Sequence, residues 1–258
     1  MKNLAELKTL HAALLDVVAE AGRCVMDVYA TDFEVADKYD KSPVTLADQK
    51  ADELIVARLK SLTPDIFIVS EESTEAGQRP ADGAPFWLVD PLDGTKEFIN
   101  RNGEFTVNVA LIQNGRPVLG VVLAPALGRM FSGIEGVGAW LTDEAGTREI
   151  RCRVPPAEGL TVVASRSHGD ASALDAFLAG RKVASLRNAG SSLKICLVAA
   201  GEADVYPRLG RTMEWDIAAG HAVLVAAGGR IEQTDGAPFG YAKPDFANPH
   251  FVAWGLSA

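Results

Sequence analysis

The first thirty residues carry apolar positions at the spacing of one helical face. Leu4, Leu7, Leu10 and Leu14 recur every three or four residues, which is the period of a helix that buries one side. The pattern predicts an amphipathic helix over residues 4–30. We expect it to be structural.

A second helix is expected after a loop over residues 31–43. The Thr45 side chain can accept a hydrogen bond from a free backbone N–H and so cap a helix over residues 47–62. Asp48 would then lie in the first turn, where a carboxylate complements the helix dipole. This interaction with the helix dipole would be enough to explain an aspartate at position 48. The alternative is a catalytic role for Asp48.

An apolar run at residues 86–89 predicts a buried strand that ends in carboxylates. Asp90 and Asp93 stand three residues apart in a turn containing Pro91 and Gly94. Such a turn can be purely structural. It can also hold a divalent cation between the two carboxylates, with Gly94 allowing a close backbone approach to an anion. Hard cations such as Mg²⁺ favour all-oxygen ligands of this kind.

Other acidic residues stand at the ends of separate elements. Residues 66–69 predict a second short strand, followed closely by Glu71 and Glu72, and Asp216 precedes an alanine-rich helical stretch. A metal site assembled from distant parts of a chain needs carboxylates in such places. These residues therefore favour the cation-binding interpretation of the turn at Asp90.

The rest of the chain predicts two kinds of architecture. Residues 104–141 alternate apolar residues with turns, which predicts an antiparallel meander. Beyond residue 158 short strands alternate with helices, so this half is expected to be α/β. The predicted strands cover residues 161–164 and 183–186, and the predicted helices cover residues 171–179, 191–200 and 215–227. Pro155-Pro156 marks a boundary between an α+β half (1–155) and an α/β half (156–258), which we expect to pack as one unit.

Composition limits the classes of function. The chain has 258 residues, 48% of them hydrophobic, a net charge of −9 and three widely separated cysteines. It contains no apolar run near the ~20 residues of a membrane span, no basic stripe for a nucleic acid polymer, and no cysteine spacing for a disulfide framework or a zinc site. We expect a cytoplasmic protein with a small-molecule ligand. Bound cations would reconcile the acidic charge with a phosphate substrate.

Four short motifs occur in a fixed order along the chain. They are Pro43 to Asp48 (PVTLAD), the pair Glu71-Glu72, Trp87 to Thr95 (WLVDPLDGT), and Trp215-Asp216 followed by Gly228-Gly229. On these motifs the chain resembles the inositol monophosphatase superfamily of Mg²⁺-dependent, lithium-sensitive phosphatases. The resemblance covers nearly the whole chain. It implies the layered sandwich of inositol monophosphatase and fructose-1,6-bisphosphatase, with alternating α-β-α-β-α layers of the α+β and α/β kind.

Further segments resemble the branch of bacterial 3'(2'),5'-bisphosphate nucleotidases. Lys96-Glu97-Phe98 follows the first signature where inositol monophosphatases usually carry T-x-N-F, and residues 101–108 continue the nucleotidase pattern. Residues 165–168, 190–194 and 206–208 resemble nucleotide-binding segments of this branch. The resemblance implies hydrolysis of the 3'-phosphate of adenosine 3',5'-bisphosphate, with the sulfated nucleotide as a further candidate substrate and a link to sulfur assimilation. The alternatives are an inositol or sugar phosphate phosphatase and a non-catalytic anion-binding protein.

The resemblance also assigns roles to residues. Two or three Mg²⁺ ions would activate a water molecule for in-line attack on phosphorus, with no phosphoenzyme. The metal ligands would be Glu71, Asp90, the carbonyl of Leu92, Asp93 and Asp216, while Asp48, Thr95 and Glu71 would be catalytic, with Glu72 behind the ligands. Substrate contacts would come from Gly94, Thr95, Lys96, His168, Ser191, Lys194, Arg208 and Asp216.

Some of these assignments have plain structural alternatives. Ser191 is also a good helix cap, and a lone His168 in a loop is more often solvated than functional. Lys38 resembles a lysine of the family, but Lys41 lies in the same loop and leaves that match open. Homodimerisation is common in the superfamily, and peripheral attachment to the inner membrane face occurs in this branch. No segment of the sequence identifies either property.

Overall fold

The structure is a computed structural model that describes residues 2–31, 43–75, 77–165 and 171–257. Lys38, Lys41 and His168, which the sequence singled out, lie outside the described residues. Within these ranges, every helix is too short or too polar to cross a lipid bilayer.

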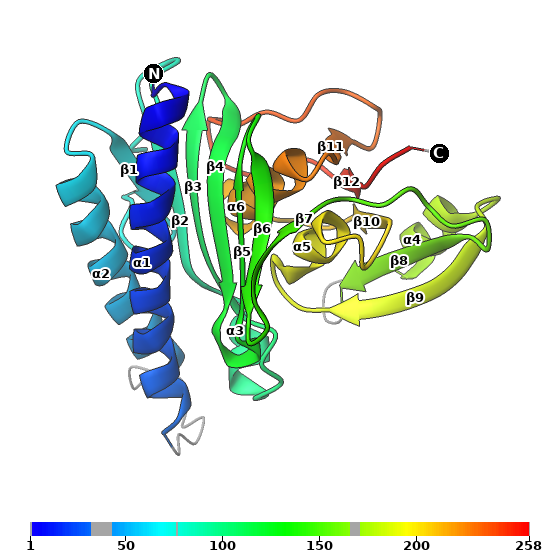
Figure 1. The fold of residues 1–258 in the computed structure, drawn as a ribbon, viewed down its shortest axis with the longest axis horizontal. Helices are drawn as coiled ribbons and strands as arrows, with labels where there is room; N and C mark the ends of the chain where they lie inside the picture. Colours follow the sequence, from blue (N-terminus) through cyan, green and yellow to red (C-terminus); the bar gives the residue numbers. More distant parts are fainter. Residues whose placement is uncertain (1, 32–42, 76, 166–170, 258) are drawn as a thin grey trace.

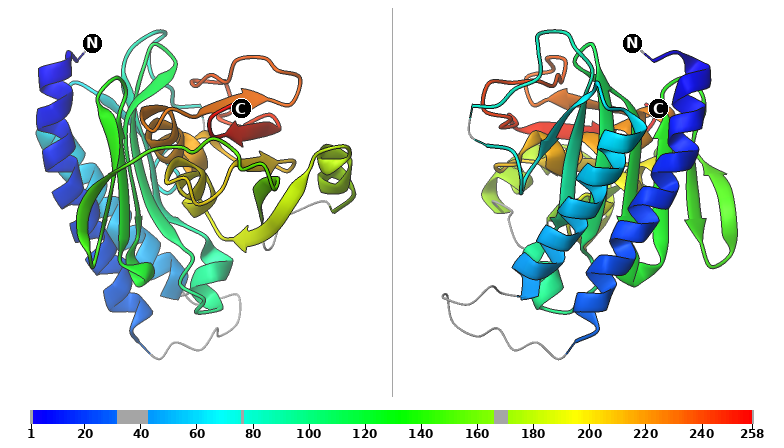
Figure 2. Two further views of the ribbon diagram at one scale, coloured as in Figure 1. Left: turned by 45° about the vertical axis from the view of Figure 1, so that its right-hand side comes forward. Right: turned by 90° about the vertical axis from the view of Figure 1, so that its left-hand side faces the viewer.

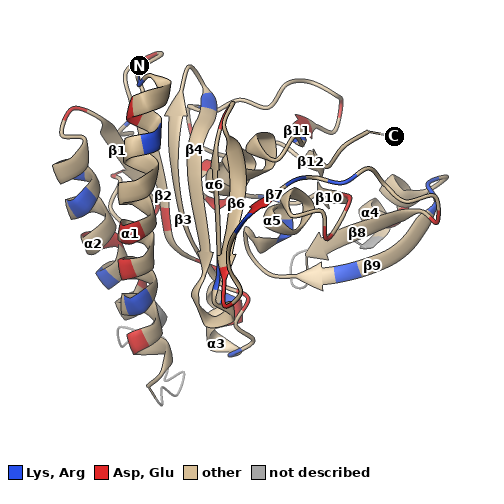
Figure 3. Cartoon of the chain, in the orientation of Figure 1, with Lys and Arg blue, Asp and Glu red and all other residues tan. Residues whose placement is uncertain are grey.

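Two long helices, α1 (Leu4–Tyr29) and α2 (Pro43–Leu62), form the outer layer on one side of the molecule. Asn3 caps α1, since its side chain accepts hydrogen bonds from the N–H groups of Ala5 and Glu6. The apolar face predicted for residues 4–30 is buried, which confirms that helix. Figure 3 shows acidic and basic residues distributed along these outer helices.

The predicted start of α2 is wrong. The helix begins at Pro43, so Thr45 lies inside it rather than at the cap, and Asp48 lies beyond the first turn. Proline is well suited to the first helical position because its missing N–H would have no partner there. Buried residues recur every four positions along α2, at Ala47, Ala51, Ile55 and Leu59. Asp48 and Asp52 follow this buried stripe by one position, which brings them beside the first strands.

A seven-stranded sheet of neighbouring chain segments packs against α1 and α2, with the strand order β1-β2-β3-β4-β5-β6-β7. Its strands are β1 (Phe67–Ser70), β2 (Phe86–Asp93), β3 (Thr106–Gln113), β4 (Arg116–Ala124), β5 (Arg129–Ile134), β6 (Gly138–Asp143) and β7 (Gly146–Ile150). A 3₁₀ turn (Pro125–Leu127) follows β4. All neighbours are antiparallel except β1 and β2. The predicted meander over residues 104–141 is confirmed, and it continues into β7.

Both faces of this sheet are buried, as the continuous apolar run of β2 shows. Trp87 and Val89 pack towards α1 and α2, while Phe86 and Leu88 join the cluster on the opposite face. Successive side chains of a strand point to opposite faces, so a strand without polar alternation must be covered on both sides. Helices from the second half of the chain cover the second face of the sheet.

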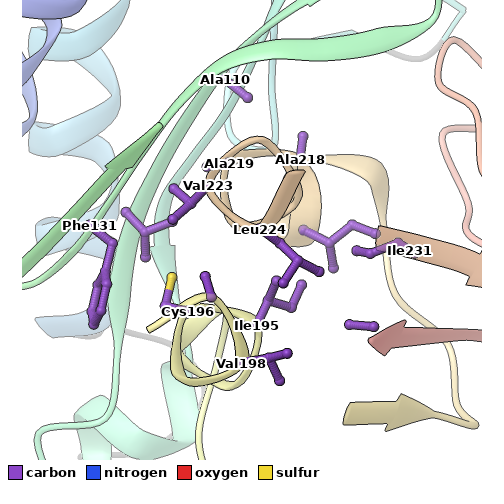
Figure 4. Close-up of a cluster of buried hydrophobic side chains, with 14 of the residues drawn as sticks. Ala110, Phe131, Ile195, Cys196, Val198, Ala218, Ala219, Val223, Leu224 and Ile231 are labelled. Carbon is purple, nitrogen blue, oxygen red and sulfur yellow. The ribbon is translucent and has the colours of Figure 1, made fainter. Parts of the chain in front are cut away.

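Helices α5 (Leu193–Ala199) and α6 (Glu214–Ala226) form the middle layer. Figure 4 shows Ile195 and Cys196 of α5 on the side that faces Val223 and Leu224 of α6, with Phe131 of the large sheet beside Cys196. Every residue of α5 is buried. One hydrophobic cluster therefore joins both halves of the chain.

Two glycines allow α6 to lie directly on the sheet. A Cβ at Gly120 of β4 would stand 2.6 Å from the carbonyl oxygen of Ala219, and one at Gly133 of β5 would stand 2.7 Å from Cα of Val223. Such distances leave no space for any side chain. This contact fixes the height of α6 above the sheet, and with it the position of Asp216 in the first turn of the helix.

The next layer beyond α5 and α6 is a five-stranded sheet with the strand order β11-β12-β10-β8-β9. The strands are β8 (Leu160–Ser165), β9 (Val183–Ala189), β10 (Val205–Arg208), β11 (Arg230–Gln233) and β12 (Phe251–Trp254). Helix α4 (Ala171–Leu178) covers its outer face, where Phe177 and Leu178 pack on Val162, Val205 and Val252. The layers are therefore α-β-α-β-α (Figure 2), and the predicted fold class is confirmed.

The sequence did not predict strands β10, β11 and β12. Each has four residues, and β10 contains Pro207 although it lies between β12 and β8. Proline lacks a donor and argues against a central strand. The structure accommodates it because the recorded pairing of β10 with β8 is at Val205, before the proline. The division of the chain near residue 155 into two halves remains a prediction.

Candidate active site

Strand β2 delivers two carboxylates at its end. The pairing with β3 is regular up to Asp90 and resumes at Asp93 after an irregularity, so Pro91 and Leu92 bulge out of the ladder. The bulge is closed by the Leu92 N–H, which donates to Asp90 Oδ1 at 3.1 Å. Gly94 then adopts φ +96°, a value that favours glycine, and the short helix α3 (Thr95–Ile99) begins.

Strand β1 places Glu71 beside this bulge. Because β1 runs parallel to β2, both strands end at the same edge of the sheet. The Glu71 N–H donates to the carbonyl of Val89 at 3.2 Å, which extends the pairing by one residue. Upstream, the Ser70 hydroxyl donates to the buried Asp52 of α2, so α2 and the end of β1 are tied together.

Helix α6 supplies a carboxylate from the other half of the chain. Asp216 lies in the first turn, where its Oδ2 accepts a hydrogen bond of 2.8 Å from the N–H of Met213. One carboxylate oxygen from each of Glu71, Asp90 and Asp216 lies within 4.8 Å of the others. These three residues are 19 to 145 positions apart in the sequence and meet only in the folded chain.

Asp93 faces the same space with different partners. Its Oδ2 accepts a hydrogen bond of 2.6 Å from the N–H of Ser192, at the start of α5. Burial raises the pKa of Asp93, and the nearby Lys194 charge opposes that rise. Asp93 therefore connects the end of β2, which carries Asp90, to the start of α5, which carries Lys194.

Crowding and burial make this cluster reluctant to ionise fully. Burial, with added repulsion from Asp93, raises the pKa of Glu71 to about 7 and that of Asp216 to about 7. The same two causes raise the pKa of Asp90 well above its usual range. Without a cation, like charges at this distance favour the protonated forms. A bound cation would reverse that preference.

Asp48 lies at the edge of the cluster. Burial raises its pKa to about 8, with the charges of Glu72 and Glu71 adding to the effect. Helix α2 thus brings Asp48 close to the acidic pair that follows β1. Glu72 itself is exposed and is absent from the described residues that line the cavity.

All these groups open into one cavity of about 380 Å³. Its lining joins these acids to basic residues from the second half of the chain. The lining residues predicted from the sequence are Asp48, Glu71, Asp90, Leu92, Asp93, Gly94, Thr95, Lys96, Ser191, Lys194, Arg208 and Asp216. The structure therefore brings together every predicted site residue except Glu72 and His168, which lies outside the described part of the chain.

Lys194 is a buried cation, 4% exposed. Its Nζ donates to the carbonyl of Ser191 at 2.6 Å and lies 5.4 Å from the centre of the Tyr206 ring. Burial lowers its pKa to about 8, although the charge of Asp93 opposes this. Arg208, at the end of β10, donates to the carbonyl of Arg211 at 2.7 Å.

Several lining residues had no role assigned from the sequence. Glu97 and Ser192 stood only within quoted segments, and Arg211 and Thr212 were not mentioned. Arg211 had a usable signal, since it follows Arg208 by three residues in a turn before the motif at Asp216. Ser191 does not act as a helix cap, because α5 has Ser192 at that position. Its hydroxyl donates instead to the carbonyl of Glu104 at 2.8 Å.

The residues present fit Mg²⁺. The donor set is carboxylate oxygen, which this ion prefers. Around the carboxylates, the buried Oγ of Ser192 has no hydrogen-bond partner among the described residues, while Asn108 and Trp215 face Asp93 and Glu71 and favour the ionised forms of these two carboxylates. Asn108 stands opposite Asp90 in the β2–β3 pairing. Unpaired polar atoms are rare in folded proteins and are expected where ions and water bind.

Comparison with known proteins agrees with this geometry. The model of the inositol monophosphatase family matches residues 6–255. The chain is 47% identical over 245 residues to the 3'(2'),5'-bisphosphate nucleotidase CysQ of Escherichia coli O157:H7, covering 92% of this chain and 98% of that protein. It is 49% identical over 234 residues to CysQ of Salmonella typhimurium, covering 90% and 94%.

Solved structures show the same fold. The crystal structure of CysQ from Bacteroides thetaiotaomicron, described as a bacterial member of the inositol monophosphatase family, aligns with a TM-score of 0.84 and 37% identity over 96% of this chain and 97% of that one. Mycobacterium tuberculosis SuhB aligns with a TM-score of 0.73 and 28% identity over 96% and 91%. From its motifs, its fold and these relatives, the chain belongs to the inositol monophosphatase family.

Proposed function

We propose that this protein is a Mg²⁺-dependent phosphatase that removes the 3'-phosphate of adenosine 3',5'-bisphosphate, giving AMP and phosphate. One observation carries the proposal: a single cavity joins a carboxylate cluster at Asp90 and Asp216 to the basic side chains of Lys194 and Arg208. The carboxylates suit metal-assisted hydrolysis, and the basic side chains suit a phosphate that is retained. The names of the CysQ relatives support the nucleotide as substrate. The sulfated nucleotide is a second candidate.

The carboxylates would hold the metal ions at which hydrolysis takes place. Glu71, Asp90, Asp93, Asp216 and the carbonyl of Leu92 would hold the ions. Bound Mg²⁺ would supply polarisation of the phosphoryl oxygens and a lower pKa for the attacking water.

Asp48 and Thr95 would orient that water. Both line the cavity beside the carboxylates, from α2 and from the first residue of α3. Holding a nucleophile in line with the bond to be broken removes much of the entropic cost of the reaction. The backbone N–H groups of Gly94 and Thr95 would receive the phosphoryl oxygens, because the positive φ of Gly94 brings the backbone itself to the cavity.

The basic side chains would select the substrate. Lys194 and Arg208 would meet the phosphate that is not hydrolysed, and Lys96, Ser191 and Asp216 would contact the rest of the nucleotide. Lys194 is preorganised for this task, since Ser191 and the Tyr206 ring hold its ammonium in place. A charge already removed from water binds an anion more strongly than an exposed one.

A panel of phosphate esters tests the proposal. Phosphate release with Mg²⁺ would be measured for adenosine 3',5'-bisphosphate, inositol 1-phosphate and fructose 1,6-bisphosphate, and kcat/KM compared. We expect a strong preference for the nucleotide. Preference for inositol 1-phosphate or fructose 1,6-bisphosphate would keep the metal chemistry and overturn the substrate. No release from any ester, with binding retained, would favour an anion-binding protein.

A further inference from the structure

A pair of hydrogen bonds joins the two halves of the chain beside the cavity. The Gly190 N–H donates to Glu104 Oε2 at 2.9 Å, and the Ser191 hydroxyl donates to the Glu104 carbonyl at 2.8 Å. Glu104 lies in the segment between α3 and β3, whereas Gly190 and Ser191 lie between β9 and α5. We call the contact between Glu104 and Gly190-Ser191 the loop clamp.

The clamp is a direct contact with the backbone of Gly190. A Cβ at this residue would stand 2.6 Å from the Glu104 carbonyl oxygen and 2.7 Å from Cγ of Glu97. Glycine is therefore the residue that allows the two segments to approach this closely. Because no side chain separates them, the Glu104 carboxylate reaches the Gly190 N–H directly.

The loop needs such support because its backbone is strained. Ser191 has φ +37°, in the left-handed region that residues with a side chain rarely adopt, at a cost of about 1–3 kcal/mol. Such a conformation persists when surrounding contacts determine it. Here Glu104 holds Ser191 and its preceding residue from one side, and the Lys194 ammonium donates to the Ser191 carbonyl from the other.

What the loop holds lies in the active site. The Ser192 N–H donates to Asp93 Oδ2 at 2.6 Å, and the Ser191 carbonyl accepts from Lys194 Nζ at 2.6 Å. Both bonds are made by the peptide group that joins Ser191 to Ser192, whose carbonyl and N–H point in opposite directions, so both depend on the orientation of that one group. If the strained residue relaxed, the Ser192 N–H and the Ser191 carbonyl would turn away from Asp93 and Lys194.

We propose that Glu104 is a positioning residue of the phosphatase site. Its carboxylate fixes the loop at Gly190-Ser191, so that Ser192 holds Asp93 among the carboxylates and Ser191 holds Lys194 in the cavity wall. Glu104 itself need not touch metal or substrate. The effect on substrate rests on the proposed function, whereas the effect on Mg²⁺ binding through Asp93 can be measured without it.

Three variants separate hydrogen bonding from charge. Glu104→Gln keeps a side-chain oxygen at the same reach and removes the charge. Glu104→Asp keeps the charge and withdraws the oxygen by one methylene, and Glu104→Ala removes both. Glu149→Ala is the matched control, because Glu149 is an exposed residue of β7 paired with Arg151.

Two readouts are needed. The first is the Mg²⁺ concentration that gives half of the full rise in Tm, without substrate. The second is KM and kcat for adenosine 3',5'-bisphosphate. We expect Glu104→Ala and Glu104→Asp to raise both the half-saturating Mg²⁺ concentration and KM by about tenfold, the effect of losing one hydrogen bond to a charged group. Glu104→Gln keeps a weaker, neutral hydrogen bond, so both quantities should rise less than in Glu104→Ala.

Either of two results would overturn the proposal. One is that Glu104→Gln is impaired as strongly as Glu104→Ala, which would make the charge decisive. The other is that Glu104→Ala lowers the Tm in EDTA but leaves Mg²⁺ affinity and KM unchanged, which would make the residue merely structural. If Glu104→Ala does not fold, the same two readouts are compared between Glu104→Asp and Glu104→Gln, and equal impairment of both variants would overturn the proposal. A wild type that binds Mg²⁺ but does not hydrolyse the nucleotide would refute the proposed function, and the Mg²⁺ titration would still test the clamp.

Discussion

The N–H of Ser192 donates a hydrogen bond of 2.6 Å to the carboxylate of Asp93, 99 positions earlier in the chain. This bond connects the end of β2 in the large sheet to the start of α5 in the middle layer. It uses Oδ2 of Asp93, a residue that also lines the cavity. The charge and the hydrogen bonding of Asp93 can therefore be tested separately.

Asp93→Asn should abolish the response to Mg²⁺ without unfolding the protein. The asparagine keeps an oxygen for the Ser192 N–H and removes one charge from a crowded cluster, so the Tm in EDTA should equal or exceed that of the wild type. The rise in Tm on adding Mg²⁺ should disappear, and kcat/KM should fall at least about 100-fold. Asp235→Asn is the control, since Asp235 caps a distant turn. Full activity of Asp93→Asn would remove Asp93 from the metal site.

Lys194→Met should weaken binding of a substrate with two phosphates more than one with a single phosphate. Methionine fills similar space but carries no charge, so the phosphate that is not hydrolysed loses its partner. We expect KM for adenosine 3',5'-bisphosphate to rise about tenfold or more, as for loss of a charge-assisted hydrogen bond, and KM for adenosine 3'-monophosphate to change less. Lys8→Met, on the exposed side of α1, is the control. Equal changes for both nucleotides would refute this role.

The metal-free protein should lose stability as the pH rises. The pKa is raised from 4.5 to about 7 for Glu71, from 3.8 to about 7 for Asp216 and from 3.8 to about 8 for Asp48. Between about pH 4 and pH 8 the folded state therefore binds more protons than the unfolded state, and its stability falls with increasing pH. Tm measured in EDTA across this range should decrease.

Saturating Mg²⁺ should remove most of this pH dependence, because a cation stabilises the ionised carboxylates. The same titration should release protons into a weakly buffered solution near pH 7. A Tm in EDTA that rises steadily from pH 5 to pH 8 would contradict the raised pKa values.

Gly120→Ala should destabilise the fold and impair the site together. The added Cβ would stand 2.6 Å from the Ala219 carbonyl, so α6 must move away from the sheet. Overpacking of this kind costs about 1–3 kcal/mol of unfolding free energy, measurable by urea denaturation. The displacement should carry Asp216 with it and raise the Mg²⁺ requirement. Gly240→Ala, where nothing lies within 4 Å, should leave both properties unchanged.

The sequence was most informative where a local pattern and a local structure coincide. The leucines of residues 4–14 predicted α1, and the apolar run before Asp90 predicted a strand that ends at the site. The start of α2 was misplaced because Thr45 is a good cap in isolation, whereas Pro43 is a better first residue of a helix. The capping preference of Thr45 and the preference of Pro43 for the first helical position predict different starts for α2, and the sequence alone does not rank them.

Contacts between distant segments were beyond such reasoning. Pro207 argues against a central strand, and β10 forms because β12 pairs with it along its whole length. The contact of Glu104 with Gly190 joins residues 86 positions apart and has no local signature. The cavity residues themselves were identified through the resemblance to a family, and the structure shows that they lie together. Their individual roles remain proposals until the variants above are measured.

The placement of α6 has a consequence for synthesis on the ribosome. The seven strands of the large sheet are complete at Ile150, yet the helix that covers one of its apolar faces begins at Glu214. Domains tend to fold from the N-terminus as the chain emerges. A nascent chain of this protein would thus hold an uncovered hydrophobic surface while some sixty further residues are translated. Because one hydrophobic core combines residues from both halves of the chain, we expect chains truncated before Glu214 to aggregate or to depend on chaperones.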